Sequence, residues 1–334
     1  NLAYISDSKV TVARDLVIQS ANESTITAKI ASVAAAVGGG AVGVGVSIGS
    51  STAENLIGWS DDGSRLASVK SYITGSTLSV TRNTQISATA EATILANVNA
   101  GSVAIGGGVV AGAAAGAGAD VSNQIALDIA AFMHDAVLNA GGTVSLAASD
   151  DSSITATSQA ASVAGSFGLI GGSVAIGVAL SDNQLRTQVD AHITNSTVRS
   201  SDDLSITAEE NAQVDSRSAA MAVASSASLG GSLSGGGAET SVTIDTDTLA
   251  YTDNSTLALG EGDLRVLADS VVSANAEVTA TSTSLGLISA AAAGSVATVT
   301  LTPTTKAYAN NTGITADEVA VEAVSTPKGT VNAR

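Results

Sequence analysis

The sequence predicts an all-β protein, a repetitive β-solenoid built from about six units of roughly 60 residues. Three observations predict this fold: a marker that recurs at a nearly constant spacing, segments that alternate with a period of two, and a composition dominated by small residues. Residues 1–334 are interpreted as one continuous array. Because each unit buries little surface alone, neighbouring units are expected to stack.

The repeat marker is a small or polar residue, then an aromatic-type residue, then usually an apolar one. Successive aromatic-type positions are 68, 60, 60, 59 and 57 residues apart, at Tyr4, Tyr72, Phe132, His192, Tyr251 and Tyr308. They divide the chain into units at 4–71, 72–131, 132–191, 192–250 and 251–307, and a partial unit at 308–334. If one unit forms one parallel coil, these side chains form a ladder with a step of about 4.8 Å.

A short alternating strand is expected after each marker. In five units an apolar residue opens this strand 11 to 13 residues past the aromatic position, within 15–18, 143–146, 203–206, 263–266 and 318–321. The unit of Tyr72 departs from the pattern, because its strand is expected sooner, at 77–80.

The rest of each unit is a long Ala/Ser/Thr stretch, a Gly-rich centre and a second long stretch. Within 174–180, branched residues alternate with Ala and Gly, which indicates a strand. Interior Gly costs a helix about 1 kcal/mol relative to Ala. The row of small residues suggests a face covered closely by another sheet or another chain. Corners are expected at 38–40 and 171–172, and a bulge or corner near 181–184, where the apolar pattern shifts by one residue.

The spacing of 68 indicates an insertion of about eight residues in the first full unit. It is placed near Gly58–Arg65, which contains the only tryptophan. Such insertions map to surface loops, and this one is either an idle loop or a binding loop.

Two coil geometries fit a unit of this length: a broad flattened cross-section, or a hairpin that projects from a smaller coil. Separate β-sandwich domains are disfavoured, since so few large side chains make a thin independent core. Neither end of the sequence resembles a cap, and the chain begins at Asn1, so we expect a segment of something longer. Further repeats or end-to-end joining of copies would then form a fibre.

The charge and composition narrow the function classes. A net charge of −17 disfavours nucleic acid and anionic lipid as partners. The absence of cysteine from the sequence excludes disulfides and thiolate metal sites. Apolar runs such as 33–47 contain too much Gly and Ser for a membrane-spanning helix.

Candidate site residues are few. His192 takes a marker position and is interpreted as a packing residue, while His134 follows a marker without a recognisable triad. Catalytic residues and cofactors are therefore not expected. Acidic pairs are expected in turns, among them 150–151 and 209–210, where they are either solvated or bind calcium. The calcium candidates are Asp61, Asp62, Asp202 and Asp203. Asn195 and Asn254 start glycosylation motifs that turn chemistry explains equally well.

The segment 173–183, followed by Asp190-Ala191-His192-Ile193, resembles repeats of very large bacterial surface adhesins, the filamentous haemagglutinin-like and leukotoxin-family filamentous adhesins. The resemblance extends over nearly the whole chain, one unit after another. It implies an exported β-solenoid at the cell surface that acts in attachment or in an extracellular filament. The family offers no catalytic residues to transfer to this chain.

The sequence therefore predicts a structural or adhesive repeat segment of an extracellular bacterial surface protein, and not an enzyme. The expected partners are copies of itself, adjacent repeats of a longer chain, and a host or neighbouring-cell surface. The alternative is a carbohydrate-active β-helix, a polysaccharide lyase or hydrolase. Such enzymes need clustered carboxylates with basic or aromatic sugar platforms, and this chain has 13 basic residues and seven aromatic side chains of Phe, Trp and Tyr.

Overall fold

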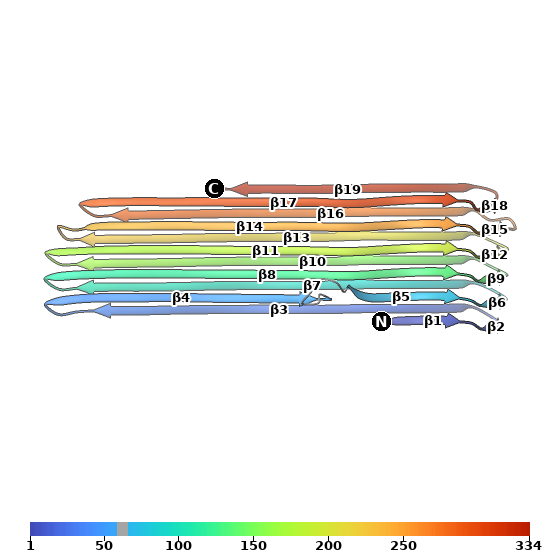
Figure 1. Cartoon of the computed structure of the whole chain (residues 1–334), viewed down its shortest axis with the longest axis horizontal. Helices are drawn as coiled ribbons and strands as arrows, with labels where there is room; N and C mark the ends of the chain where they lie inside the picture. Colours follow the sequence, from blue (N-terminus) through green and yellow to red (C-terminus); the bar gives the residue numbers. More distant parts are fainter. Residues whose placement is uncertain (59–65) are drawn as a thin grey trace.

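The structure is a computed structural model that describes residues 1–58 and 66–334. The described ranges contain strands, turns and bends and no helix, so the chain is all-β. The strands form three parallel sheets and wind as a β-solenoid, with the two termini at opposite ends of the stack (Figure 1). The long strands run along the longest dimension of the molecule.

Each coil consists of an outgoing long strand, a returning long strand and a short strand, for example β7, β8 and β9. The outgoing sheet contains β3 (Leu16–Gly38), β7 (Thr84–Gly107), β10 (Val144–Phe167), β13 (Leu204–Ala227), β16 (Leu264–Leu285) and β19 (Val319–Ala333). The returning sheet contains β1 (Leu2–Ser6), β4 (Val42–Ile57), β5 (Ala67–Thr74), β8 (Val110–His134), β11 (Ile170–Thr194), β14 (Gly231–Asp253) and β17 (Ile288–Asn310). The short sheet contains β2 (Lys9–Val12), β6 (Thr77–Val80), β9 (Val137–Ala140), β12 (Thr197–Ser200), β15 (Thr256–Leu259) and β18 (Gly313–Thr315).

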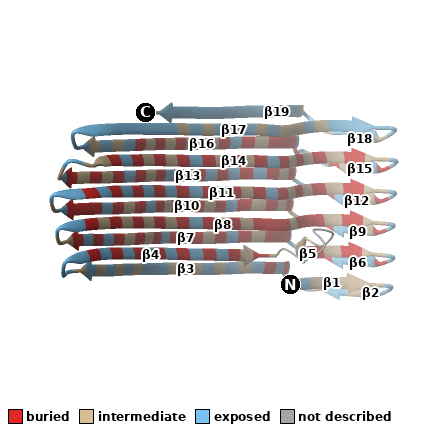
Figure 2. Cartoon of the chain, turned by 60° about the vertical axis from the view of Figure 1, so that its left-hand side comes forward, coloured by how far each residue is buried: buried red, intermediate tan, exposed pale blue. Residues whose placement is uncertain are grey.

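The outgoing and returning sheets pack face to face, and the short sheet closes one end of the coil. Of the two geometries that the sequence left open, the structure has the broad flattened cross-section. We call the half beside the short sheet the wide half, and the half beside the Gly-rich connections the thin half. Buried and exposed positions alternate along each long strand (Figure 2).

The wide half holds the large aliphatic core. Ile86 and Ile94 of the outgoing sheet face Ile125, Leu127 and Ile129 of the returning sheet, and all five are fully buried. Removing such side chains from water stabilises the fold by about 1.5–3 kcal/mol each. The isoleucine and leucine side chains therefore set the distance between the two sheets in this half.

The thin half has a core of a different kind. Its separate cluster contains only alanines, at Ala104, Ala113, Ala115, Ala164, Ala175, Ala222 and Ala224. Inward glycines let the two backbones approach further. A Cβ atom added to Gly45 would lie 2.4 Å from the carbonyl oxygen of Ile105, and one added to Gly177 would lie 2.7 Å from that of Met221. The small-residue face is thus covered by the other sheet of the same chain, one of the two coverings that the sequence suggested.

The expected bulge near 181–184 is absent. β11 alternates in one phase from Ile170 to Thr194, with Ala175, Gly177 and Ala179 inward and Leu185 inward as well. The apolar pattern shifts because the two halves use opposite faces for large residues. In the thin half the small residues point inward and the branched ones outward, whereas in the wide half the large residues point inward.

Three other local predictions are corrected. The segment 77–80 is β6 of the short sheet, and the counterpart of Leu16 is Thr84, which follows Tyr72 by the usual 12 residues. The start of β7 does not follow the apolar pattern because it has Thr84 where β3 has Leu16. The strands that follow the markers are also long, since β7 alone has 24 residues. The corner at 38–40 is confirmed, but Gly171–Gly172 lies inside β11, and the connection there is at 168–169.

The insertion lies where the sequence placed it. Ile57 pairs with Ile125 and Ala67 pairs with Leu127, so the sequence has nine residues between these two positions where β8 has Ala126 alone. Nine residues in place of one is an insertion of eight. Asp61 and Asp62, two of the calcium candidates, lie outside the described residues, and so does the tryptophan.

Candidate functional site

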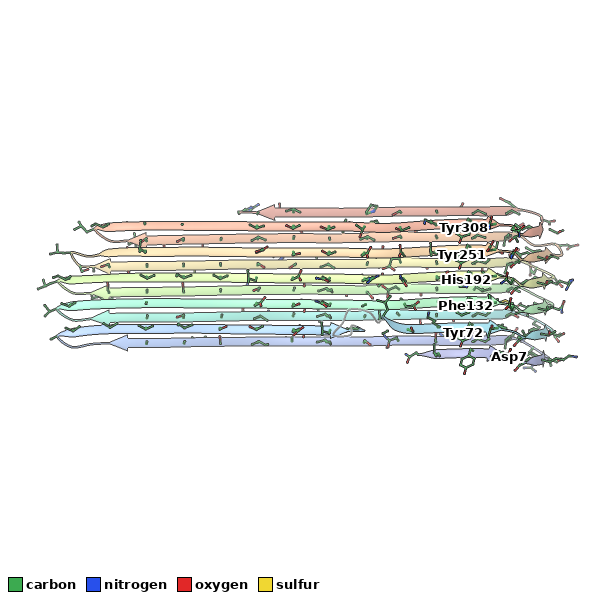
Figure 3. The ribbon with its side chains drawn as sticks, in the orientation of Figure 1. Asp7, Tyr72, Phe132, His192, Tyr251 and Tyr308 are labelled. Atoms are coloured by element: carbon green, nitrogen blue, oxygen red, sulfur yellow. The ribbon has the colours of Figure 1, made fainter. Side chains whose placement is uncertain are left out.

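The marker side chains stack in one column on the outer face of the returning sheet, beside the short sheet (Figure 3). Neighbouring ring centroids are 4.7–4.9 Å apart and the rings are within 12° of parallel, in the order Tyr4, Tyr72, Phe132, His192, Tyr251 and Tyr308. The spacing equals the strand repeat of a parallel sheet, because each ring occupies the same register position. We call this set the aromatic ladder.

Polar groups support the ladder. The Nδ1 atom of His192 is 2.9 Å from the Oδ1 atom of Asp190 on the same face. Burial, followed by the negative charge of Asp190, raises the pKa of Tyr251. The Tyr251 ring therefore stays neutral around physiological pH and serves as a packing group.

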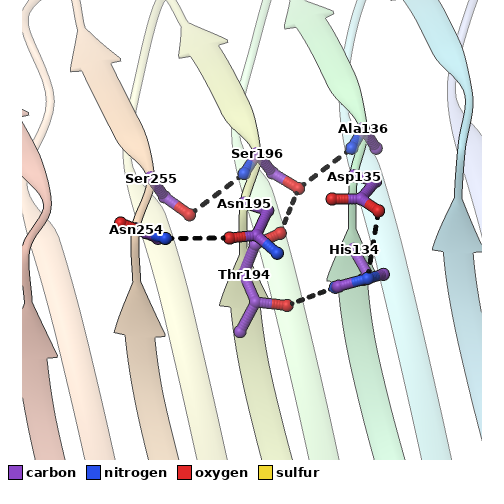
Figure 4. Close-up of polar contacts among 8 residues, drawn as sticks. All are labelled: His134, Asp135, Ala136, Thr194, Asn195, Ser196, Asn254 and Ser255. Carbon is purple, nitrogen blue, oxygen red and sulfur yellow. Dashed lines mark hydrogen bonds and ion pairs between the residues drawn. The ribbon is translucent and has the colours of Figure 1, made fainter.

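The turn after each returning strand has the same chemistry in successive coils (Figure 4). Asn195 and Asn254 adopt φ values of 50° and 53°, a left-handed conformation that asparagine tolerates better than most residues. The amide of Asn254 donates to Oδ1 of Asn195 at 3.2 Å, and the backbone N–H of Ser196 donates to Oγ of Ser255 at 3.2 Å. Both asparagines thus take part in bonds between coils, which accounts for their sequence motif.

His134 is the last residue of β8 and pairs with Thr194, which precedes the turn at Asn195. Its Nδ1 atom is 2.8 Å from Oγ1 of Thr194, and its Nε2 atom is 3.1 Å from Oδ2 of Asp135 (Figure 4). The imidazole is partly exposed. The Nδ1 contact therefore links two coils, whereas the Nε2 contact stays within one turn.

Asp203, a calcium candidate, accepts a backbone hydrogen bond from the next coil. Its Oδ1 atom accepts the N–H of Asp263 at 2.9 Å, and Oδ1 of Asp263 accepts the N–H of Glu318 at 3.0 Å. Asp202 is turned to its own neighbour, since its Oδ1 accepts the N–H of Asp203 at 3.0 Å. Among the described residues, no group of three or more His, Asp or Glu side chains is arranged to hold a metal ion.

A row of buried asparagines crosses the interior between the two halves. Asn55 donates to Asn123 at 2.7 Å, and Asn123 donates to Asn183 at 2.7 Å. Asn183 then donates to Ser181 and to Ser216 of the opposite sheet, at 2.9 and 2.8 Å. These buried amides satisfy one another along the axis and fix the register where the core changes from large to small residues.

Two acidic residues lie inside the solenoid, and sequence reasoning misplaced them. The pairs 150–151 and 209–210 were expected in turns, but they lie within β10 and β13, with Asp150 and Glu210 inward and Asp151 and Glu209 outward. Asp150 and Glu210 are partners in register and are 3% and 2% exposed. Burial raises the pKa of Asp150 to about 7, and it also raises the pKa of Glu210, where the charge of Asp150 adds to the effect. Alternation along 144–154 was the signal that could have located them.

Large apolar side chains cover the outer faces of the thin half. On the returning sheet they form an apolar band of Val42, Val44, Val46, Ile48, Val110, Ile170, Val174, Ile176, Val178, Leu180, Leu233 and Ile288. A second row follows the Gly-rich connections, at Val109, Leu169, Leu229 and Leu287. Large contiguous patches of exposed apolar surface usually mark interaction sites.

Comparison of the chain with family models, with curated proteins and with solved structures found no match. The described residues contain no helix long and apolar enough to cross a membrane. The fold and the columns of stacked residues therefore assign the chain to a class of protein: it is a repetitive all-β protein with the architecture of a parallel β-solenoid.

Proposed function

We propose that the chain is a structural and adhesive repeat segment of an extracellular bacterial surface protein, made of six units that each form one coil. The aromatic ladder is the observation that carries this proposal. Rings at identical register positions stack at 4.7–4.9 Å, so each coil offers the next coil the same kind of stacking surface that it packs against itself. Such a stack builds length, which is what a filament or a stalk requires.

The apolar band supports the adhesive part of the proposal. Small residues are buried between the two sheets of the chain, so they are not available for packing between copies. The outward branched residues of the thin half are available instead, and Val174, Ile176 and Val178 project from one strand on one face. Copies of the chain, or a host or neighbouring-cell surface, are the proposed partners of this band.

Location at the cell surface and likeness to filamentous adhesins rest on the sequence. The outer faces of the wide half carry acidic residues such as Asp151, Glu209 and Asp269, in keeping with the net charge of −17. We propose that this charge keeps the segment hydrated and prevents association over most of its surface. Association is then confined to the thin half.

Electron microscopy of the purified chain tests the structural proposal. Elongated particles or filaments are expected, and a population of round particles alone would contradict it. The adhesive proposal is tested by the triple variant Val174→Ser, Ile176→Thr, Val178→Ser, which is expected to reduce side-by-side association without loss of β circular dichroism. Arg186→Gln and Gln188→Ala, on the outer face of the same strand in the wide half, form the matched control.

One observation favours a second function, a carbohydrate-active β-helix. A shallow hollow of about 310 Å³ on the outgoing sheet is lined by several carboxylates, including Asp151, Glu209 and Asp269. Its described lining includes neither basic nor aromatic side chains, which sugar-cleaving sites use as platforms. Cleavage of any member of a polysaccharide panel, abolished by Glu209→Gln, would establish this function instead.

A further inference from the structure

Within residues 1–58 and 66–334, Asp150 and Glu210 are the two buried acidic residues, and neither has a cationic partner. They occupy the same register position of adjacent strands, β10 and β13, which lie about 4.8 Å apart. In the same row, Ala90 precedes Asp150 and Ser270 follows Glu210. The returning sheet places Thr187 near Glu210.

The oxygen atoms of this interior cluster lack hydrogen-bond partners. Oδ1 of Asp150 accepts a hydrogen bond from Ser152 at 2.8 Å, but its Oδ2 atom and both carboxylate oxygens of Glu210 accept none. The hydroxyl of Thr187, a residue 1% exposed, is also without a partner. Thr246 and Ser270, the neighbours of Thr187 and Glu210 in the next coil, have unpartnered hydroxyls too. Buried polar atoms normally have partners, so such a concentration of orphaned oxygens requires an explanation.

The chemistry of these unpartnered oxygen atoms indicates which kind of ligand would bind them. The set contains only oxygen donors, from two carboxylates and from hydroxyl groups, and it contains no nitrogen or sulfur. Hard divalent cations prefer such ligands, whereas zinc prefers His and Cys. Calcium accepts irregular arrangements of several oxygens, while magnesium demands a near-ideal octahedron and retains water. Two carboxylates also match the charge of a divalent ion.

We propose that Asp150, Glu210 and Thr187 form an interior binding site for calcium, which links two successive coils of the solenoid. The cation neutralises both carboxylates and occupies their free oxygens together with the threonine hydroxyl. This site is distinct from the turn aspartates that the sequence suggested, and it differs from common calcium sites in having two carboxylates and not three or more. It connects the outgoing strands β10 and β13 to the returning strand β11.

The charges around the pair agree with this assignment. Burial raises the pKa of Asp150 to about 7 and also raises that of Glu210. The charged residues nearest the pair are acidic: Asp151 follows Asp150, and Glu209 and Asp269 lie on the same outer hollow. Ala90, Ser270, Thr187 and Thr246 face the pair and carry no charge.

Metal analysis of the purified full chain at pH 8 tests the proposal. The chain is dialysed against EDTA, then against CaCl₂, and the bound metal is measured by equilibrium dialysis with elemental analysis. One calcium ion per chain is expected, with a rise in Tm of about 3 °C or more on addition of saturating calcium. Calcium that is retained through the EDTA step supports the site equally. The absence of bound calcium together with an unchanged Tm overturns it.

Variants of the inner and outer acids locate the ion. Asp150→Asn with Glu210→Gln preserves side-chain shape and removes the buried charges, so the chain is expected to fold and to lose calcium. Asp151→Asn with Glu209→Gln changes the adjacent outward residues of the same strands and is expected to keep it. Loss of calcium from the outer variant, with retention by the inner one, would move the ion to the surface hollow and contradict the proposal. Thr187→Val is expected to weaken calcium binding at least tenfold.

Discussion

The two halves of each coil stabilise the same pair of sheets by different means. In the wide half, side chains such as Ile129 and Leu127 fill the space between the sheets, and the stabilisation comes from buried aliphatic area. In the thin half the sheets approach until alanine methyl groups and glycine backbone touch, and the branched residues are displaced to the outer faces. The wide half should therefore be sensitive to the loss of atoms, and the thin half to their addition.

The largest effect is expected from truncation in the wide half. Ile129→Ala removes atoms from a fully buried side chain and should lower the free energy of unfolding by about 2–5 kcal/mol, because a cavity remains between two rigid sheets. Denaturant midpoints followed by circular dichroism measure this loss. Ile176→Ala on the outer face of the thin half is the control, and its effect should stay within about 0.5 kcal/mol. Equal losses in the two variants would remove the distinction between the halves.

The buried acids of the wide half give the next effect, which depends on pH. The pKa of Asp150 is raised from 3.8 to about 7 in the folded chain, so the folded state binds more protons than the unfolded state between these values. Without calcium, the contribution of Asp150 to stability is therefore complete below about pH 4 and is lost as the pH rises to about 7. The loss amounts to at most roughly 4 kcal/mol.

Denaturant unfolding in EDTA at a series of pH values, compared between the wild type and Asp150→Asn/Glu210→Gln, isolates this contribution. The difference between the two proteins should change by a few kcal/mol as the pH rises from 4 to 7. A difference that is independent of pH would show that the pair titrates like exposed acids.

Enlargement in the thin half is expected to cost about 1–3 kcal/mol. A Cβ atom at Gly177 meets the backbone of Met221 at 2.7 Å, so Gly177→Ala must push the two sheets apart. Gly237→Ala is the matched control, because Gly237 lies on the neighbouring strand with nothing within 4 Å of the added carbon. Thermal unfolding should show a lower Tm for the first variant and an unchanged or higher one for the second. A neutral Gly177→Ala would mean that the thin half has room for larger residues.

The smallest effect concerns the aromatic ladder, which lies on the outer face of the wide half. His192→Ala removes the stacking contacts with Phe132 and Tyr251 and should lower the free energy of unfolding by about 1 kcal/mol. His192→Tyr keeps both contacts, and its free energy of unfolding should stay within about 0.5 kcal/mol of the wild type. Denaturant titration at pH 8 resolves the two. If tyrosine destabilises the chain as much as alanine, then the hydrogen bond to Asp190 matters more than the stacking.

The sequence predicted the class of fold and the repeat because both depend on spacing that a single chain displays. The recurrence of Tyr72, Phe132 and His192 at intervals of 60 needs no tertiary information. The direction in which each side chain points was harder to predict. Large residues at Val174 and Ile176 were interpreted correctly as strand but gave no sign that they point outward, since burial of large residues is the usual rule.

The interior acids show the same limitation. Acidic pairs suggest turns, because carboxylates are seldom buried, so Asp150 and Glu210 were placed at the surface. Only the unbroken alternation from Val144 to Ile154, with apolar residues on one side, indicates that Asp150 lies inward. The chemical character of one residue was given more weight than its position in the pattern, and position was the better guide.

The eight extra residues between β4 and β5 have a consequence for how such a chain can diversify. Pairing with β8 stops at Ile57 and resumes at Ala67, and the two partners on β8 are separated by Ala126 alone, so β8 does not shift to accommodate the added length. Variation in length at this position is therefore independent of the scaffold. New peptide can be displayed there, and replaced, while every rung of the stack keeps its place.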